Sequence, residues 1–344
     1  MPKIKNNIIR DAVALSPHYL DTLETTSDCS RTKTHASQYS KAMRKHATNQ
    51  KLKSIIDTIS DKLIKKKYWN TYHCNRVLLQ DGFTFKGSLC RKRWCAHCCR
   101  IKTAEMTNGY KQPLQELGPL YFVTLTRPNV KARQLSDEIK KMTKGFQRIK
   151  DNLRKNYGIK LNGIRKIEVT YNEIEDTFHP HFHFIQSNYN ASIKLQELWL
   201  AQFSNAKLIA QDVRPINTHN DDSFIELFKY ATKETTKSGK QYTGKVLHTI
   251  YSALEGKRIY QAYGKLKKVK EPLEAKSDAS QITWIEPNED IWVYDDNLSD
   301  WIDGDGQELV MTHSFTEQQK TLNLKQYENT SQRQSRRISQ RITS

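Results

Sequence analysis

The stretch FHPHFHF, residues 178–184, carries three histidines at every second position. Alternate residues of a β-strand point to the same face, so His179, His181 and His183 would project together while the phenylalanines point to the core. Imidazole nitrogens are frequent ligands of divalent metals. The spacing therefore indicates either a metal site or a polar, solvated strand face, and three histidines in register favour the metal.

The segment IRKIEVTYN, residues 164–172, alternates in the same way and predicts a partner strand. In a short antiparallel hairpin both apolar sets must face the same side, because a slip of one residue inverts a strand. This places Glu168 on the histidine face, and opposite His183 if the turn is centred near residues 175–176. Two imidazoles and one carboxylate then form a site that suits Mg²⁺ or Mn²⁺ and leaves room for substrate oxygens.

The segment FIELFKYATK, residues 224–233, predicts a helix with several reactive side chains on one face. Glu226 and Tyr230 are one turn apart, Lys233 continues that face and Lys229 flanks it. A tyrosine can act as a covalent nucleophile, and a glutamate can activate water as a general base. Surface helices with Glu, Tyr and Lys are common, so this stretch indicates chemistry only when a metal site lies nearby.

Four of the six cysteines fall within residues 90–99. A structural zinc ion prefers a closed tetrahedral set of thiolates, and the spacing x15, x4, x2 supplies four of them. These candidate ligands are Cys74, Cys90, Cys95 and Cys98. Alternative ligands are His73, His97 and Cys99, and the alternative interpretation is a set of reduced cysteines without metal. The basic residues around Trp94 would give this segment a phosphate-facing surface.

The 344-residue chain has a net charge of +19, which is typical of proteins that bind a polyanion, most often nucleic acid. The alternative is a generically basic protein, but the charge is segregated: residues 277–319 contain eleven acidic side chains and no Lys or Arg. No apolar run approaches the roughly 20 residues of a membrane span. The N-terminus lacks the pattern of a secretory signal, so we expect a cytoplasmic protein that does not bind membranes.

Hydrophobic periodicity predicts an α+β fold with a largely antiparallel sheet flanked by helices, because hairpins and helices are mixed along the chain. We expect helices over residues 49–67, 103–117, 131–155, 192–206 and 222–237, and strands over residues 120–126, 164–172, 179–186 and 208–216. The first 45 or so residues and the last 25 have the composition of weakly ordered segments.

The same patterns divide the chain into four parts. They are a basic N-terminal arm with one amphipathic helix (1–67), a Cys-rich zinc-binding and DNA-contacting segment (68–118), a catalytic domain (119–270), and an acidic segment with a disordered basic tail (271–344).

Three of these motifs together resemble a known family. FVTLT (122–126), HPHFHF (179–184) and ELFKYATK (226–233) appear in the order and style of rolling-circle plasmid replication initiators of the HUH endonuclease superfamily. The cysteine cluster is similar to one found in many members. The resemblance covers roughly residues 70–240, about half the chain, and implies the HUH-type sheet with a zinc-knuckle-like insertion.

The resemblance implies that His181 and His183 are metal ligands on either side of Phe182. His179 would be a third ligand or a group behind the ligands, and Glu168 competes with it for that position.

The resemblance also implies that Tyr230 cleaves one strand at the origin, keeps a 5′-phosphotyrosyl link and releases a 3′-hydroxyl for the host polymerase. Glu226 stands where a subgroup of these initiators carries a carboxylate that activates water at termination, so that one tyrosine suffices. Lys229 or Lys233 would assist electrostatically. The expected partners are origin DNA, as a single-stranded or hairpin nick site with flanking duplex, the host helicase and DNA polymerase, and a second copy of the chain in a homodimer.

Three other functions compete with this interpretation. A mobilisation relaxase or a single-strand transposase would share the chemistry, but relaxases generally place the tyrosine ahead of the histidines and such transposases are usually much shorter. A zinc-containing DNA-binding regulator would use the same charge and cysteines and would bind DNA without cutting it.

Overall fold

The structure is a computed structural model of the 344-residue chain. It describes residues 29–81, 84–216, 227–228, 234–236, 239–266 and 290–310. Contacts between these residues define two compact units. The first contains residues 29–99 and 290–310, and the second contains residues 100–266.

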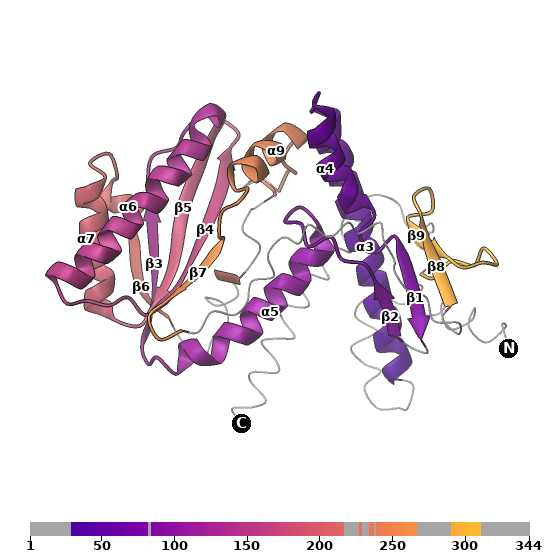
Figure 1. Ribbon diagram of the computed structural model, residues 1–344, viewed down its shortest axis with the longest axis horizontal. Coiled ribbons are helices and arrows are strands. Elements are labelled where there is room, and N and C mark those ends of the chain that lie inside the picture. Colours follow the sequence, from indigo (N-terminus) through magenta and orange to yellow (C-terminus); the bar gives the residue numbers. More distant parts are fainter. Residues whose placement is uncertain are drawn as a thin grey trace. The chain divides into compact units, whose positions relative to one another are not determined.

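The second unit is built on a five-stranded, fully antiparallel sheet in the order β6-β3-β5-β4-β7 (Figure 1). The strands are β3 (Leu120–Thr126), β4 (Gly163–Asn172), β5 (Thr177–Gln186), β6 (Asp212–Ile216) and β7 (Tyr260–Tyr263). With its flanking helices, this sheet confirms the predicted α+β class. The strand expected over 208–216 is shorter than predicted, because residues 208–210 form a 3₁₀ turn, η2 (Leu208–Ala210).

Helices α6 (Leu135–Asn156) and α7 (Tyr189–Gln202) cover the phenylalanine face of this sheet. The unit also contains α5 (Ala96–Gln115), which begins in the first unit, the 3₁₀ turn η1 (Ala132–Gln134) and α9 (Gly244–Ala253). From α6, Phe146 packs edge-on against Phe182 and Phe184 with centroids 5.7 and 6.0 Å apart. From α7, Trp199 lies 5.8 Å from Phe182. The opposite face of β5 is therefore the one that carries the histidines.

The charged residues at the two ends of α6 stabilise this long helix. Asp137 and Glu138 stand in its first turn and Arg154 and Lys155 in its last, which complements the helix dipole. Gly145 permits close packing, since a Cβ there would lie 2.3 Å from the Phe203 ring.

The N-terminal helix prediction needs correction. Instead of one helix over 49–67, the chain forms two helices, α3 (Cys29–Asp57) and α4 (Lys62–Tyr72). A new helix begins after Asp61, because the Asp61 carboxylate caps α4 by accepting from the Leu63 and Ile64 amides at 2.7 and 3.0 Å. The expected weak order is wrong for residues 29–45, which are helical, while residues 1–28 lie outside the described residues. The cause is a long-range contact, because Ala42 and Met43 are buried in one cluster with Trp292 and Trp301.

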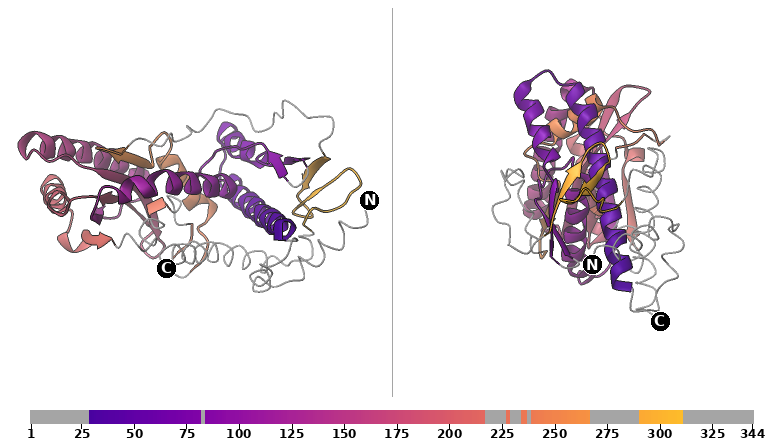
Figure 2. Two further views of the ribbon diagram at one scale, coloured as in Figure 1. Left: turned by 90° about the horizontal axis from the view of Figure 1, so that it is seen from below. Right: turned by 90° about the vertical axis from the view of Figure 1, so that its right-hand side faces the viewer.

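The first unit also contains a four-stranded antiparallel sheet in the order β2-β1-β8-β9. The two strands that come last in the chain are drawn in yellow in Figure 2. Its strands are β1 (Val77–Asp81), β2 (Thr84–Gly87), β8 (Asp290–Asp295) and β9 (Asp300–Ile302). Leu78 pairs with Trp292, and the Trp301 indole donates to the Asn75 carbonyl at 2.8 Å. Residues 290–310 are thus grouped with residues 29–99, whereas the sequence analysis set residues 271–344 apart.

Two further predictions concern the helix expected over residues 222–237 and the absence of a membrane span. Of the helix expected over 222–237, only Leu227 and Phe228 are described as helical, and Thr235 forms a β-bridge with Gln241 instead of continuing a helix. Among the described helices, none combines the length and the apolar character needed to cross a bilayer.

Candidate functional site

The β4–β5 hairpin fixes which side chains share the histidine face. Glu168 pairs with His181, Lys166 with His183, and Thr170 with His179. The prediction that Glu168 lies opposite His183 is therefore wrong by two residues. The turn is centred earlier than expected, since the Asn172 side-chain oxygen accepts from the amides of Ile174 and Glu175 at 3.1 and 3.4 Å. A shift of two residues preserves the face, so Glu168 still lies with the histidines.

The structure brings Glu168, His181 and His183 together. The Nε2 atoms of the two histidines are 3.1 Å apart, and Glu168 Oε2 lies 3.9 Å from His183 Nε2. One ligand atom from each residue lies within 4.8 Å of the others. Glu168 and His181 are buried, with 2% and 7% exposure, whereas His183 is half-buried. The group is therefore a preformed set of two nitrogens and one carboxylate.

A hydrogen bond leaves the lone pair of His181 on Nε2, and the contact of His183 permits the same arrangement. His181 Nδ1 lies 3.1 Å from the His179 carbonyl, which only accepts, so Nδ1 carries the proton and Nε2 carries the lone pair. His183 Nδ1 lies 3.3 Å from the Thr124 hydroxyl, which can accept in the same way. Two lone pairs at this separation repel each other, whereas nitrogens about 2.1 Å from a shared ion at a right angle are about 3 Å apart. The donor set fits a divalent cation.

His179 lies outside the three-donor group. Its ring stacks on His181 with centroids 5.0 Å apart. Burial, with a smaller contribution from nearby His181, lowers the pKa of His179 to about 4. Its carbonyl accepts a hydrogen bond from His181 Nδ1 and thereby fixes the His181 tautomer.

Sequence reasoning missed the role of Lys166. Its Nζ lies 2.7 Å from Glu168 Oε2, and the two side chains are only 1% and 3% exposed. A buried carboxylate without a cation would be costly, so Lys166 supplies the charge that allows Glu168 to remain ionised inside the protein. The sequence signal was the alternation of the strand, because Lys166 is two residues from Glu168 and therefore points to the same, histidine-bearing face. Thr124 on β3 pairs with His183 and shares that face.

The four residues of the predicted nucleophile helix, Glu226, Lys229, Tyr230 and Lys233, lie outside the described residues. Their immediate neighbour Phe228 is buried and stacks on Tyr110 of α5, with centroids 5.9 Å apart and rings nearly parallel. The Tyr260 hydroxyl donates to the Phe228 carbonyl at 3.2 Å. Tyr260 pairs with Lys166 across β4 and β7, so Phe228 is held on the histidine face of the sheet.

A second donor group lies in the first unit. Sulfur–sulfur distances are 3.6 Å for Cys74–Cys98, 3.7 Å for Cys90–Cys98 and 3.6 Å for Cys74–Cys95. Four sulfurs bound to one zinc ion at 2.3 Å would be about 3.8 Å apart, so the four buried thiols fit a structural zinc ion. Interactions with the neighbouring thiols, that of Cys74 first, hold the pKa of Cys95 well below its usual range.

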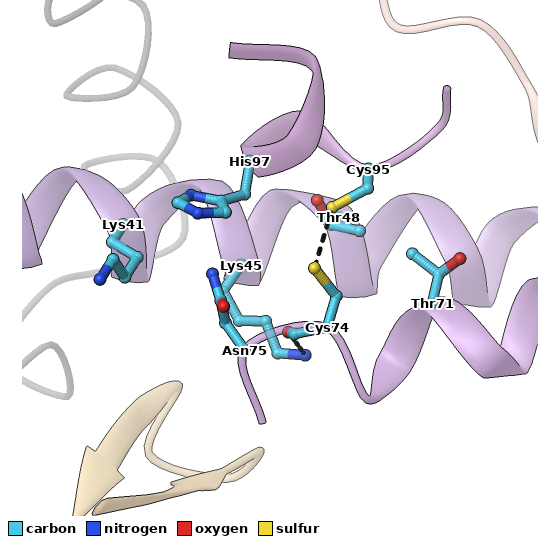
Figure 3. A pocket seen from close by; sticks show the side chains of 8 residues that line it. All are labelled: Lys41, Lys45, Thr48, Thr71, Cys74, Asn75, Cys95 and His97. Carbon is cyan, nitrogen blue, oxygen red and sulfur yellow. Dashed lines mark hydrogen bonds between the residues drawn. The ribbon is translucent and has the colours of Figure 1, made fainter. Parts of the chain in front are cut away.

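The alternative ligands are separated from this group. The Cys99 thiol donates to the Arg93 carbonyl at 3.0 Å. Figure 3 shows the sulfurs of Cys74 and Cys95 pointing toward each other, while the His97 ring lies toward Lys41. Burial, followed by the nearby Arg44 charge, lowers the pKa of His97 to about 4.

Comparisons with known proteins identify the family of the chain. Residues 82–302 match the model of a family described as "Replication protein". The chain belongs to this replication protein family. The resemblance to rolling-circle plasmid replication initiators is thereby confirmed, and with it a role in initiating plasmid replication.

Relatives named "Protein rep" support the same assignment. The Staphylococcus aureus protein is 28% identical over 173 residues, which cover 46% of this replication protein and 75% of the relative. The Bacillus amyloliquefaciens protein is 25% identical over 242 residues, or 60% and 71% of the two chains. The Streptococcus pneumoniae protein is 24% identical over 237 residues, or 62% and 70%. No solved structure matches significantly.

Proposed function

We propose that this replication protein nicks and recloses one DNA strand at the plasmid origin through a 5′-phosphotyrosyl intermediate at Tyr230. The observation that carries the proposal is the pair of imidazole Nε2 atoms, 3.1 Å apart beside the Glu168 carboxylate. Such a constellation on a rigid sheet fits the positioning of a phosphodiester at a divalent cation.

His181, His183 and Glu168 would hold Mn²⁺ or Mg²⁺. The ion would supply Lewis-acid polarisation of the scissile phosphate and neutralise its developing charge. Thr124 and the His179 carbonyl hold the two rings so that both Nε2 atoms face the same point. Burial of the Phe182 ring between them keeps the strand fixed, because that ring packs into the core against α6 and α7.

Tyr230 would perform the cleavage. Its oxygen bonds to phosphorus as the bond from phosphorus to the 3′ oxygen breaks, and the 3′-hydroxyl leaves as a primer. Phe228, two residues earlier, is anchored by Tyr110 and Tyr260 on the histidine face, which supports the approach of Tyr230 to the metal site. Lys229 and Lys233 would stabilise negative charge electrostatically.

Glu226 would act at termination. By taking a proton from water it would convert the second cleavage into hydrolysis, so that no second tyrosine is required. The host polymerase would extend the released 3′-hydroxyl, and a host helicase would unwind the duplex. A homodimer would bring two copies to one origin, and zinc at Cys74, Cys90, Cys95 and Cys98 would stabilise the first unit.

A cleavage assay tests this proposal. A labelled single-stranded oligonucleotide carrying the origin nick site is incubated with the full chain and Mn²⁺. We expect metal-dependent cleavage that Tyr230→Phe abolishes. The matched control is Tyr157→Phe, since Tyr157 is an exposed tyrosine of the same unit. Full cleavage by Tyr230→Phe would contradict the tyrosine assignment, and binding without any cleavage would favour the regulator.

A further inference from the structure

Positive charge is concentrated in one short stretch of the chain. Residues 62–104 contain eleven Lys and Arg residues and a single acidic residue, Asp81. Helix α4 (Lys62–Tyr72) begins this stretch with four lysines and no acidic residue. The one carboxylate next to it, Asp61, is engaged as the helix cap. The positive charge of α4 is therefore not neutralised within the helix.

Helix α4 also exposes apolar side chains beside its lysines. Leu63 is 80% exposed and Trp69 is 49% exposed, although α4 is otherwise packed through Tyr68, which is 2% exposed. Lys62, Lys66 and Trp69 follow one another at helical spacing and share a face. Together with Ile64, which is 37% exposed, these apolar side chains form a group of exposed apolar residues rimmed by lysines, as interaction surfaces often have.

The cysteine segment is docked on this helix. The Trp94 indole donates to the Thr71 hydroxyl at 2.6 Å, and its ring lies 4.7 Å from that of Tyr68. Lys67 Nζ lies 5.8 Å from the centroid of the same indole. Cys74 lies two residues after the end of α4, and its amide donates to the Thr71 carbonyl at 2.9 Å. The four-cysteine group thus fixes α4 beside the basic run Arg91-Lys92-Arg93, residues 91–93.

We propose that α4 and residues 91–93 form a docking surface for the duplex DNA that flanks the nick site. The inference rests on the proposed function for its ligand, because an origin-nicking enzyme must hold duplex beside the single strand it cuts. Lysines and arginines without intervening carboxylates complement a phosphate backbone, and an exposed helix has the width of a major groove. Trp69 and Leu63 would contact sugars or base edges between the phosphates.

The other basic helix, α6, is a weaker candidate. Its 22 residues contain seven Lys and Arg residues and three carboxylates, and Lys140 forms an ion pair with Asp137 at 3.1 Å. Lys150 lies 3.9 Å from Asp151. These carboxylates would repel phosphates, so the net attraction of α6 for DNA is smaller than that of α4.

Salt dependence of duplex binding tests the surface. The full chain is titrated against a short, fluorescein-labelled duplex of mixed sequence, with no Mg²⁺ or Mn²⁺ added, and anisotropy is followed at several NaCl concentrations. Each phosphate contact contributes about 0.9 to the slope of log affinity against log salt. The double variant Lys62→Ala with Lys66→Ala should reduce the slope of log affinity against log salt by about 2 and weaken duplex binding about tenfold. Trp69→Ala should weaken binding with little change of slope.

The matched control removes the same charge from α6, through Lys141→Ala with Lys144→Ala, and should change the slope less. Circular dichroism melts verify folding of each variant. If both α4 variants bind the duplex as the wild type does, the proposal is overturned and Leu63 and Trp69 become a protein-docking face. If the α4 and α6 double variants lose equal DNA affinity, the proposal is overturned because the effect is one of overall charge. Since no cleavage is measured, failure of the tyrosine chemistry would not affect this result.

Discussion

The Lys166 ammonium lies 2.7 Å from the same Glu168 oxygen that is 3.9 Å from His183 Nε2. The lysine is fully buried next to a carboxylate that also belongs to the candidate metal centre. A single carboxylate oxygen thus lies close both to an internal cation and to a nitrogen of the candidate metal centre.

Replacing Lys166 by methionine should have opposite effects on stability and on metal binding. The unpaired Glu168 carboxylate would lower the free energy of unfolding of the metal-free protein by about 3–5 kcal/mol. The same carboxylate, no longer neutralised, would bind Mn²⁺ about tenfold more tightly. Thermal melts and Mn²⁺ titration followed by electron paramagnetic resonance measure both effects. Lys160→Met, at an exposed position, is the control, and unchanged Mn²⁺ affinity in Lys166→Met would refute the shared-oxygen interpretation.

Thr124→Val should weaken metal binding without disrupting the fold. Its hydroxyl lies 3.3 Å from His183 Nδ1, and valine removes that partner while keeping the shape of the side chain. Loss of such a supporting hydrogen bond lowers metal affinity about tenfold or more. The control is Thr143→Val, where the hydroxyl donates only to the Ile139 carbonyl in α6. If both variants bind Mn²⁺ alike, Thr124 does not orient His183.

The cysteine group should hold one zinc ion per chain. Metal analysis of protein purified without added metal should find zinc in the wild type and in Cys99→Ser, because the Cys99 thiol contacts backbone carbonyls rather than the other sulfurs. Cys90→Ser should lose the ion and melt at a lower temperature, since metal binding and folding are coupled in such sites. Zinc-free wild-type protein with unchanged stability would show that the thiols are simply reduced.

Glu226→Ala should separate initiation from termination. Nicking of a supercoiled origin plasmid should persist, because the tyrosine remains, whereas the covalent protein–DNA adduct should accumulate through loss of the general base. Denaturing gels that resolve free and protein-bound DNA measure the ratio. A variant that releases DNA at the wild-type rate would remove Glu226 from the termination step.

The histidine site was largely predictable and its register was not. Parity alone put Glu168 on the face of His181 and His183, because both strands must turn their apolar residues to one core. The pairing was missed by two residues, since parity does not specify how many residues the turn consumes. The burial of Lys166 depends on its neighbours Glu168 and Tyr260, which alternation within one strand does not reveal.

The first unit was less predictable for a related reason. Strand β1 pairs with β8, more than two hundred residues later in the chain, and α3 is stabilised by Trp292 and Trp301 from that distant segment. Local composition made residues 29–45 look weakly ordered and assigned residues 290–310 to a separate acidic segment. The four cysteines were still recognised, because metal-ligand spacing is a local pattern.

Mapping the covalent adduct is the most direct test of the central claim. A single-stranded oligonucleotide carrying the origin nick site is incubated with the full chain and Mn²⁺, and the adduct is digested and sequenced by tandem mass spectrometry. We predict one 5′-phosphorylated nucleotide remnant on Tyr230, absent from His181→Ala and from Tyr230→Phe. A remnant on any other residue, or cleavage that proceeds in Tyr230→Phe, would contradict the account.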